Sequence, residues 1–177
     1  ALVSAHPSQV IFTSGGTEAN NLALSQGQGD SVIVSSIEHD SILNVHTRAK
    51  PLNVSSDGII CVDHLRSLLA EASHKSIISV MLANNETGVL QPIEQVSTIG
   101  HSHRALVHCD AIQAIGKIDV NWQALGVDMM SLSAHKLGGP QGVGALIADE
   151  KLKFLPYLKG GGQERSRRAG TENVSGI

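Results

Sequence analysis

The chain has 177 residues, of which 41% are hydrophobic and 16% charged, and its formal net charge is −3. These values predict one folded domain with its own core and exclude a disordered chain. Because the sequence has no long basic run, nucleic acids and anionic membrane surfaces are not expected partners.

Signals for export or membrane insertion are missing from these residues. No stretch approaches the roughly 20 apolar residues that a membrane span needs, and residues 1–9 carry neither a basic nor an apolar leader region. Cys61 and Cys109 lie in separate apolar runs without CxxC spacing, which is typical of reduced, buried thiols. We therefore expect a cytoplasmic protein.

Short apolar runs alternate with helical patterns along the chain. We predict strands at residues 10–13, 32–35, 77–83, 105–109, 129–133 and 143–148. Residues 63–72 have helical periodicity behind a capping Asp63, and Pro92 opens another helix. Because the strands are too apolar to have one wet face, the alternation predicts an α/β fold with a mostly parallel sheet flanked by helices.

Polar side chains follow the predicted strands, at the edge where ligands bind in such sheets. The segments in question are Ser14-Gly15-Gly16-Thr17, Glu38-His39-Asp40, Asn84-Asn85-Glu86, Asp110 with Gln113, and Ser133-Ala134-His135-Lys136. This recurrence of catalytically capable groups predicts a functional site at the carboxyl ends of the strands.

The first of these segments joins a strand to a helical pattern that begins near Glu18. The backbone at Gly16, the amino end of the helix and the Thr17 hydroxyl would together suit a phosphate group. The alternative is a tight turn in which Thr17 is the N-cap of the helix.

Lys136 follows an apolar strand and precedes two glycines, an arrangement that would hold a nucleophilic amine at the site. Ser133 and His135 lie on either side and would donate hydrogen bonds to a phosphate. The alternatives are a surface lysine, with Ser133 and His135 bonding to local backbone groups.

Asp110 ends the strand predicted at residues 105–109. A buried carboxylate is costly without a cationic partner, and a pyridinium nitrogen would serve as that partner. The Gln113 amide would then reach the phenolic oxygen of the same ring. The alternative is that Asp110 only caps the turn that follows it.

The imidazole of His39 would stack on a ring and move protons near neutral pH. Apart from His39 and His135, the remaining seven histidines receive no role, and the spacing of His101 and His103 does not amount to a metal site. Neither a GxGxxG nor a GxxxxGK[ST] fingerprint is present, which argues against a nicotinamide dehydrogenase or a P-loop protein. Residues 160–173 read either as a flexible basic loop or as an anion-binding segment.

Six motifs follow one another in order along the chain. They are TSGGTEANN, SSIEHDS, LANNETG, HCDAIQAIGK, SAHKLGGPQGVGAL and GGGQERSRRAGTEN. The series resembles the cysteine desulfurases, a branch of the class V aminotransferases that use pyridoxal 5′-phosphate (PLP), and it covers nearly the whole chain. The resemblance implies that residues 1–177 are part of the PLP-binding large domain of a fold type I transferase. By the same resemblance, an amino-terminal segment and a carboxyl-terminal small domain are missing from this chain.

The resemblance also implies roles for individual residues. Lys136 would carry PLP covalently and move protons, and His39 would stack on the ring and act as a second proton carrier. The other expected contacts are Asp110 with the pyridine nitrogen, Gln113 with the phenolic oxygen, Gly16, Thr17, Ser133 and His135 with the phosphate, Asn85 between cofactor and substrate carboxylate, and Thr171 with the phosphate of the neighbouring subunit in a homodimer.

The implied reaction converts L-cysteine to L-alanine and leaves a persulfide on an enzyme cysteine, for iron–sulfur cluster assembly or another sulfur-acceptor or scaffold protein. The family's persulfide cysteine lies downstream of GTEN, so we expect residues 1–177 alone to be inactive. The alternatives are a selenocysteine lyase acting on L-selenocysteine, another class V aminotransferase, and a non-catalytic PLP-binding or dimerisation fragment.

Overall fold

One twisted sheet organises the chain in the computed structural model, which describes residues 2–27, 31–72 and 75–177. Within these residues the sheet has seven strands in the order β1-β7-β6-β5-β4-β2-β3. β7 runs antiparallel to both of its neighbours, and all other adjacent pairs are parallel. The strands are β1 (Val10–Thr13), β2 (Ser31–Ser35), β3 (Lys50–Leu52), β4 (Ser76–Met81), β5 (Leu106–Asp110), β6 (Met129–Ser133) and β7 (Gly144–Ala148).

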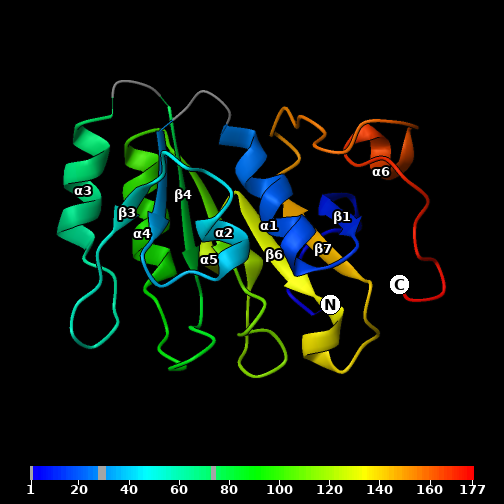
Figure 1. The fold of residues 1–177 in the computed structure, drawn as a ribbon, viewed down its shortest axis with the longest axis horizontal. Coiled ribbons are helices and arrows are strands. Elements are labelled where there is room, and N and C mark those ends of the chain that lie inside the picture. The colour runs from blue at the N-terminus through cyan, green and yellow to red at the C-terminus, as the bar shows by residue number, and fades with distance from the viewer. Residues whose placement is uncertain (1, 28–30, 73–74) are drawn as a thin grey trace.

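Helices cover both faces of the sheet (Figure 1). The α-helices are α1 (Gly16–Leu24), α2 (Asp40–Leu43), α3 (Val62–Ala70), α4 (Ile93–Ser102), α5 (Trp122–Leu125) and α6 (Gln163–Ser166), and the 3-10 turns are η1 (Pro7–Gln9), η2 (Ser25–Gly27) and η3 (Ala134–Leu137). α1 and α2 pack on one face, and α3 and α4 pack on the other. The predicted α/β fold with a mostly parallel sheet is confirmed.

The core consists of two apolar layers, one on each side of the sheet. Successive side chains of a strand point to opposite faces, so Ile77 packs under α1 while Ile78 packs under α4. Met129 and Met130 of β6 divide between the layers in the same way. This two-sided burial explains why the strands are continuous apolar runs in the sequence.

The structure differs from the sequence predictions in several ways, and the predicted strand at residues 77–83 is observed as β4 (Ser76–Met81). β3 was not predicted, because it has three residues and contains Pro51, which is tolerated here on an edge strand. α3 begins at Val62, so Asp63 lies inside its first turn and is not the cap. Cys61 precedes that helix and is exposed, which corrects the prediction that it is buried, whereas Cys109 is buried as predicted.

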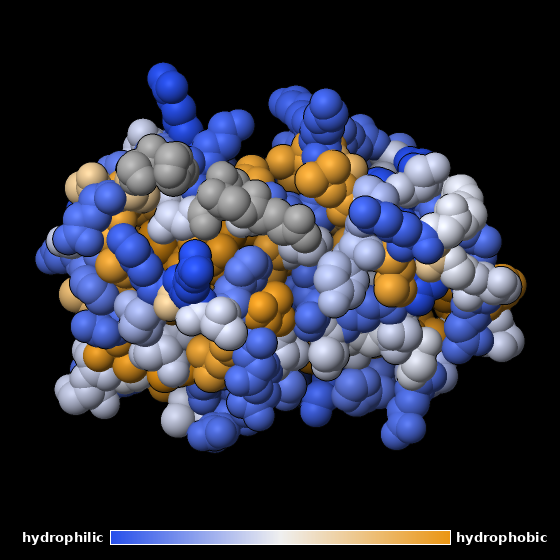
Figure 2. Space-filling model, turned by 45° about the horizontal axis from the view of Figure 1, so that its top comes forward, coloured by the Kyte–Doolittle hydropathy of each residue, from blue (hydrophilic) through white to orange (hydrophobic). Residues whose placement is uncertain are grey.

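None of the helices in the part of the chain described here is long and apolar enough to span a bilayer. Figure 2 shows polar and apolar side chains mixed on the face that it draws.

A buried polar row crosses the centre of the sheet on the α1 side. The two ring nitrogens of His108, on β5, lie 2.9 Å from the Oγ of Ser79 on β4 and 2.8 Å from the Oγ of Ser131 on β6. Burial lowers the pKa of His108 from 6.5 to about 3, so its ring is neutral in the folded protein at neutral pH.

The buried His108 ring predicts a loss of stability in acid. Below pH 6.5 an unfolded chain binds a proton at this histidine, but the folded chain does not until about pH 3. The free energy of unfolding should therefore fall by about 2 kcal/mol between pH 8 and pH 5 through this group alone. Urea unfolding of the full-length wild type and of His108→Gln measures the difference, and an identical pH dependence in the two proteins would contradict it.

Candidate active site

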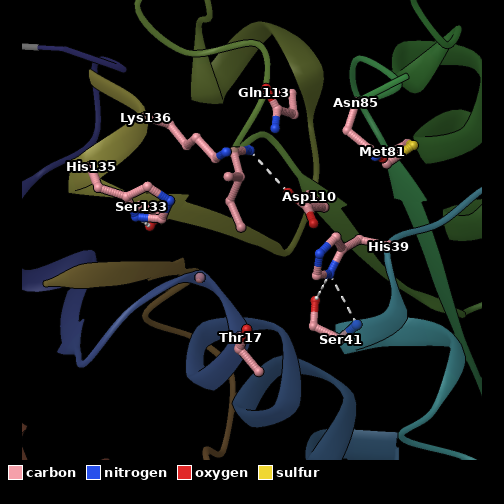
Figure 3. A pocket seen from close by; sticks show the side chains of 12 residues that line it. Thr17, His39, Ser41, Met81, Asn85, Asp110, Gln113, Ser133, His135 and Lys136 are labelled. Carbon is pink, nitrogen blue, oxygen red and sulfur yellow. Dashed lines mark hydrogen bonds between the residues drawn. The ribbon is translucent and has the colours of Figure 1, made fainter. Parts of the chain in front are cut away.

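A cavity of about 400 Å³ lies at the carboxyl ends of the parallel strands (Figure 3). Its walls come from the segments that follow β1, β2, β4, β5 and β6. The lining residues are Gly16, Thr17, His39, Ser41, Met81, Asn85, Asp110, Ile112, Gln113, Ser133, His135 and Lys136. The structure thus brings together every site residue predicted from the sequence except Thr171.

Lys136 lies in η3, directly after the carboxyl end of β6. Gly138 ends this turn with a φ of +81°, a left-handed conformation that favours glycine. The lysine side chain is exposed and extends toward the middle of the cavity in Figure 3. A primary amine is therefore presented to the same space as the Asp110 carboxylate.

One side of the cavity carries hydrogen-bond donors suited to an anion. The amino end of α1 begins at Gly16, and the first N–H groups of a helix have no acceptor inside it. Gly15 is the N-cap, so Thr17 is the second helical residue and not the cap, contrary to the alternative weighed from the sequence. The Oγ of Ser133 lies 2.9 Å from the Nδ1 of His135 on the same side.

Two glycines allow the turn between β1 and α1 to pack closely against its neighbours. A Cβ on Gly16 would lie 2.2 Å from the Cδ1 of Ile112, and a Cβ on Gly144 would lie 2.5 Å from the backbone carbon of Gly15. The turn between β1 and α1 therefore rests directly on β7, which fixes the amino end of α1 at the cavity.

Asp110 is buried at the end of β5 with 4% of its surface exposed. Its carboxylate accepts hydrogen bonds from the backbone N of Ile112 at 2.9 Å and the Nδ2 of Asn20 at 2.8 Å. Burial raises the pKa of Asp110, and these two bonds oppose the increase. The bond to Ile112 confirms that Asp110 caps the turn after β5. No lysine or arginine of the described segments pairs with it, so its charge is available to a cationic group in the cavity.

Gln113 lies in the same turn and is half-buried. Its Oε1 accepts a hydrogen bond from the Nζ of Lys117 at 2.7 Å. This bond orients the amide and leaves its NH₂ group as a donor to a ligand.

His39 is the N-cap of α2. Its Nδ1 accepts a hydrogen bond from the backbone N of Ser41 at 3.0 Å and lies 2.9 Å from the Oγ of Ser41. The ring is therefore held in place beside Asp110 at the cavity (Figure 3).

Sequence reasoning missed the polar residues that support these side chains. Asn20 and Ser41 bond to Asp110 and His39, but they lie inside helices and carry no strand-end signal. Glu38 was noted only as part of a motif. Its Oε1 accepts a hydrogen bond from the backbone N of Met81 at 2.6 Å, and its Oε2 is buried without a partner. Burial, reinforced by Asp110, raises the pKa of Glu38 well above its ordinary 4.5.

Thr171 lies outside the main cavity. It is exposed and lines a separate recess of about 90 Å³. Arg168 connects this segment to the site, because its guanidinium pairs with Glu18 in the first turn of α1 at 2.7 Å.

The predicted basic loop after Gly162 contains the short, kinked helix α6. Arg165 and Arg167 donate hydrogen bonds to backbone carbonyl groups in residues 8–10. These two guanidinium groups are therefore engaged within the chain, which weakens the hypothesis that they bind an anion.

The aminotransferase class-V family profile matches residues 1–177, and the chain belongs to this family. It is 45% identical to a cysteine desulfurase of Bradyrhizobium diazoefficiens, over 99% of this chain and 47% of that protein. It is 41% identical to the cysteine desulfurase IscS of Dictyoglomus turgidum, over 99% of this chain and 47% of that protein. The chain thus spans about half the length of the curated relatives that it matches.

Solved structures agree with this assignment. A NifS-like protein from Rickettsia africae has a TM-score of 0.90 and 41% identity, covering 94% of this chain and 47% of that one. A structure of SspA in complex with cysteine has a TM-score of 0.90 and 32% identity, covering 99% of this chain and 54% of that one.

Proposed function

We propose that this chain forms the cofactor-binding large domain of a PLP-dependent cysteine desulfurase, which converts L-cysteine to L-alanine and a protein-bound persulfide. The observation that carries the proposal is that the buried Asp110 carboxylate and the Lys136 amine line the same cavity. The relatives named cysteine desulfurase, at 41–45% identity, support the same activity.

The residues around the cavity fit PLP. Asp110 offers a buried carboxylate that no lysine or arginine among the described residues pairs with, which suits a protonated ring nitrogen. The amino end of α1, Ser133 and His135 offer donors to a phosphate on the opposite side. When bound, PLP supplies a ring that withdraws electrons from the Cα of an attached amino acid.

Each side chain then has a specific task. Asp110 would keep a proton on the ring nitrogen, Gln113 would donate to the phenolic oxygen, and His39 would stack on the ring. Lys136 would hold the cofactor covalently, and its free Nζ would take the Cα proton of the substrate. Asn85 lines the cavity from the segment after β4, and it would lie between the cofactor and the substrate carboxylate.

Neither cysteine of residues 1–177 fits the role of the thiol that takes the substrate sulfur. Cys61 is exposed but does not line the cavity, and Cys109 is buried in the sheet. Burial raises the pKa of Cys109 well above 9.0, with Asp110 and Glu38 adding to the increase, so its thiolate is disfavoured. Both cysteines are thus poor candidates for the thiol that attacks the substrate sulfur.

Assays on the full-length protein test this function. With L-cysteine and a thiol reductant, we expect alanine and sulfide in equal amounts. Formation of 3-mercaptopyruvate from L-cysteine when 2-oxoglutarate is added, with neither alanine nor sulfide, would indicate an aminotransferase and contradict the proposal. A kcat/KM for L-selenocysteine far above that for L-cysteine would favour a selenocysteine lyase.

We further propose a cytoplasmic homodimer that delivers sulfur to an iron–sulfur scaffold or another acceptor protein, and in which Thr171 binds the PLP phosphate of the partner subunit. Thr171 is exposed and lies outside its own subunit's cavity, so it is accessible to a neighbour. Arg168, bonded to Glu18, holds the segment in a fixed position.

A mixed dimer of Thr171→Ala and Lys136→Ala subunits tests this arrangement. Only one of its two sites has an intact Lys136. If Thr171 acts across the interface, that site receives the threonine from the Lys136→Ala subunit and binds PLP with wild-type affinity. If that site binds PLP as weakly as the Thr171→Ala homodimer, Thr171 acts within its own subunit and the proposal is wrong.

A further inference from the structure

Asn20 lies in the middle of α1 and is fully buried. Its Nδ2 is 2.8 Å from the Oδ2 of Asp110 and 2.9 Å from the Oγ of Ser41. A carboxylate oxygen only accepts hydrogen bonds, so the amide presents its NH₂ group to Asp110. Both hydrogens of that group are then engaged, one by Asp110 and one by Ser41.

The same chain of hydrogen bonds continues from Ser41 to His39. The backbone N–H of Ser41 donates to the Nδ1 of His39 at 3.0 Å, so Nδ1 is an acceptor and carries no proton. The Oγ of Ser41 accepts from Asn20 and is 2.9 Å from the same Nδ1, to which it donates its own hydrogen.

The acceptors at the two ends of this hydrogen-bond series determine which group donates in each bond. Asp110 and the Nδ1 of His39 accept, and Asn20 and Ser41 donate between them. The neutral His39 ring therefore carries its proton on Nε2, leaving that atom as the proton carrier at the cavity. Figure 3 shows His39, Ser41 and Asp110 grouped on one side of the cavity.

We propose that Asn20 is a positioning residue that couples Asp110 to His39. It orients the carboxylate directly and, through the Oγ of Ser41, reinforces the Nε2–H tautomer of His39 that the backbone N–H of Ser41 sets. Its importance for PLP rests on the proposed function, but the hydrogen-bond chain does not. One further feature distinguishes Asn20 from a residue that only fills space. Its Oδ1 is buried without a partner, an unfavourable arrangement that an apolar side chain would avoid.

Asn21 provides a matched control on the same helix. Its Nδ2 donates to the backbone oxygens of Thr17 at 2.8 Å and Ser41 at 3.3 Å. It thus joins α1 to α2 but touches neither Asp110 nor the ring of His39. If Asn20 served only to join these helices, the two alanine variants would behave alike.

The first measurement records the ring nitrogens of His39 by NMR in the full-length protein without cofactor, with histidine labelled by ¹⁵N. The His39→Gln variant assigns the signals. We expect an unprotonated Nδ1 and a protonated Nε2 in the wild type, shifted signals in Asn20→Ala and Ser41→Ala, and wild-type signals in Asn21→Ala. A protonated Nδ1 in the wild type, or identical signals in all four proteins, would overturn the proposal.

The second measurement is the dissociation constant for PLP. Losing one of the hydrogen bonds to the Asp110 carboxylate should weaken binding about tenfold in Asn20→Ala, whereas Asn21→Ala should change it less than about twofold. Asn20→Asp keeps the shape but places a second carboxylate against Asp110, so it should bind more weakly than Asn20→Ala. Equal affinities for the Asn20→Ala and Asn21→Ala variants would overturn the coupling. If the wild type fails to bind PLP, the proposed function is wrong. The NMR measurement would still show whether the hydrogen bonds from Asp110 to His39 run as proposed.

Discussion

Replacing Asp110 with asparagine in the full-length enzyme should lower kcat/KM for alanine production from L-cysteine by about 10²- to 10⁴-fold. The asparagine has nearly the same shape, but it is uncharged and cannot keep a proton on the ring nitrogen. Removing one member of a buried charge pair costs about 3–5 kcal/mol, which corresponds to a rate loss of this size. Steady-state alanine formation at saturating PLP measures the effect.

Asp128 offers a matched control for this substitution. Its carboxylate is half-buried near the amino end of β5 and accepts from the backbone N of Val107 at 2.7 Å. Asp128→Asn removes a comparable charge at the edge opposite the site, so kcat/KM should stay within about threefold of the wild type. Equal losses in the two variants would show that the effect of Asp110→Asn comes from stability, and near-normal turnover by Asp110→Asn would refute its role.

Lys136→Ala should abolish covalent binding of PLP and lower alanine production by at least about 10²- to 10⁴-fold. This factor counts only the loss of a positioned proton carrier at the substrate Cα. The loss of covalent PLP binding would lower the rate further. Lys151→Ala is the control, because Lys151 is exposed and follows β7, whose carboxyl end lies at the opposite edge. Retention of more than about a hundredth of the wild-type rate by Lys136→Ala would contradict the assignment.

Much of the fold could be predicted from hydrophobic runs, because buried parallel strands leave a continuous apolar signal. The strands β1 and β6 begin and end where the sequence places them. The edge strand β3 was missed, since three residues that include a proline give no such signal. Only the tertiary structure shows that these residues pair with β2.

The cavity could be predicted because each parallel strand delivers its polar residues to the same edge of the sheet. Asp110 is the last residue of β5, and His39 and Lys136 lie shortly after the ends of β2 and β6. Asn20 differs in kind. It is 90 residues from Asp110 in the sequence and lies inside a helix, so only the packing of α1 on β5 reveals the contact.

The most direct test of the account is to locate the lysine that carries PLP. The full-length protein is incubated with PLP, reduced with borohydride and digested, and the pyridoxyl-labelled peptide is sequenced by mass spectrometry. We expect the label on Lys136 alone, because it is the lysine that lines the cavity containing Asp110. A label on Lys117, Lys151 or another lysine would contradict the proposed site.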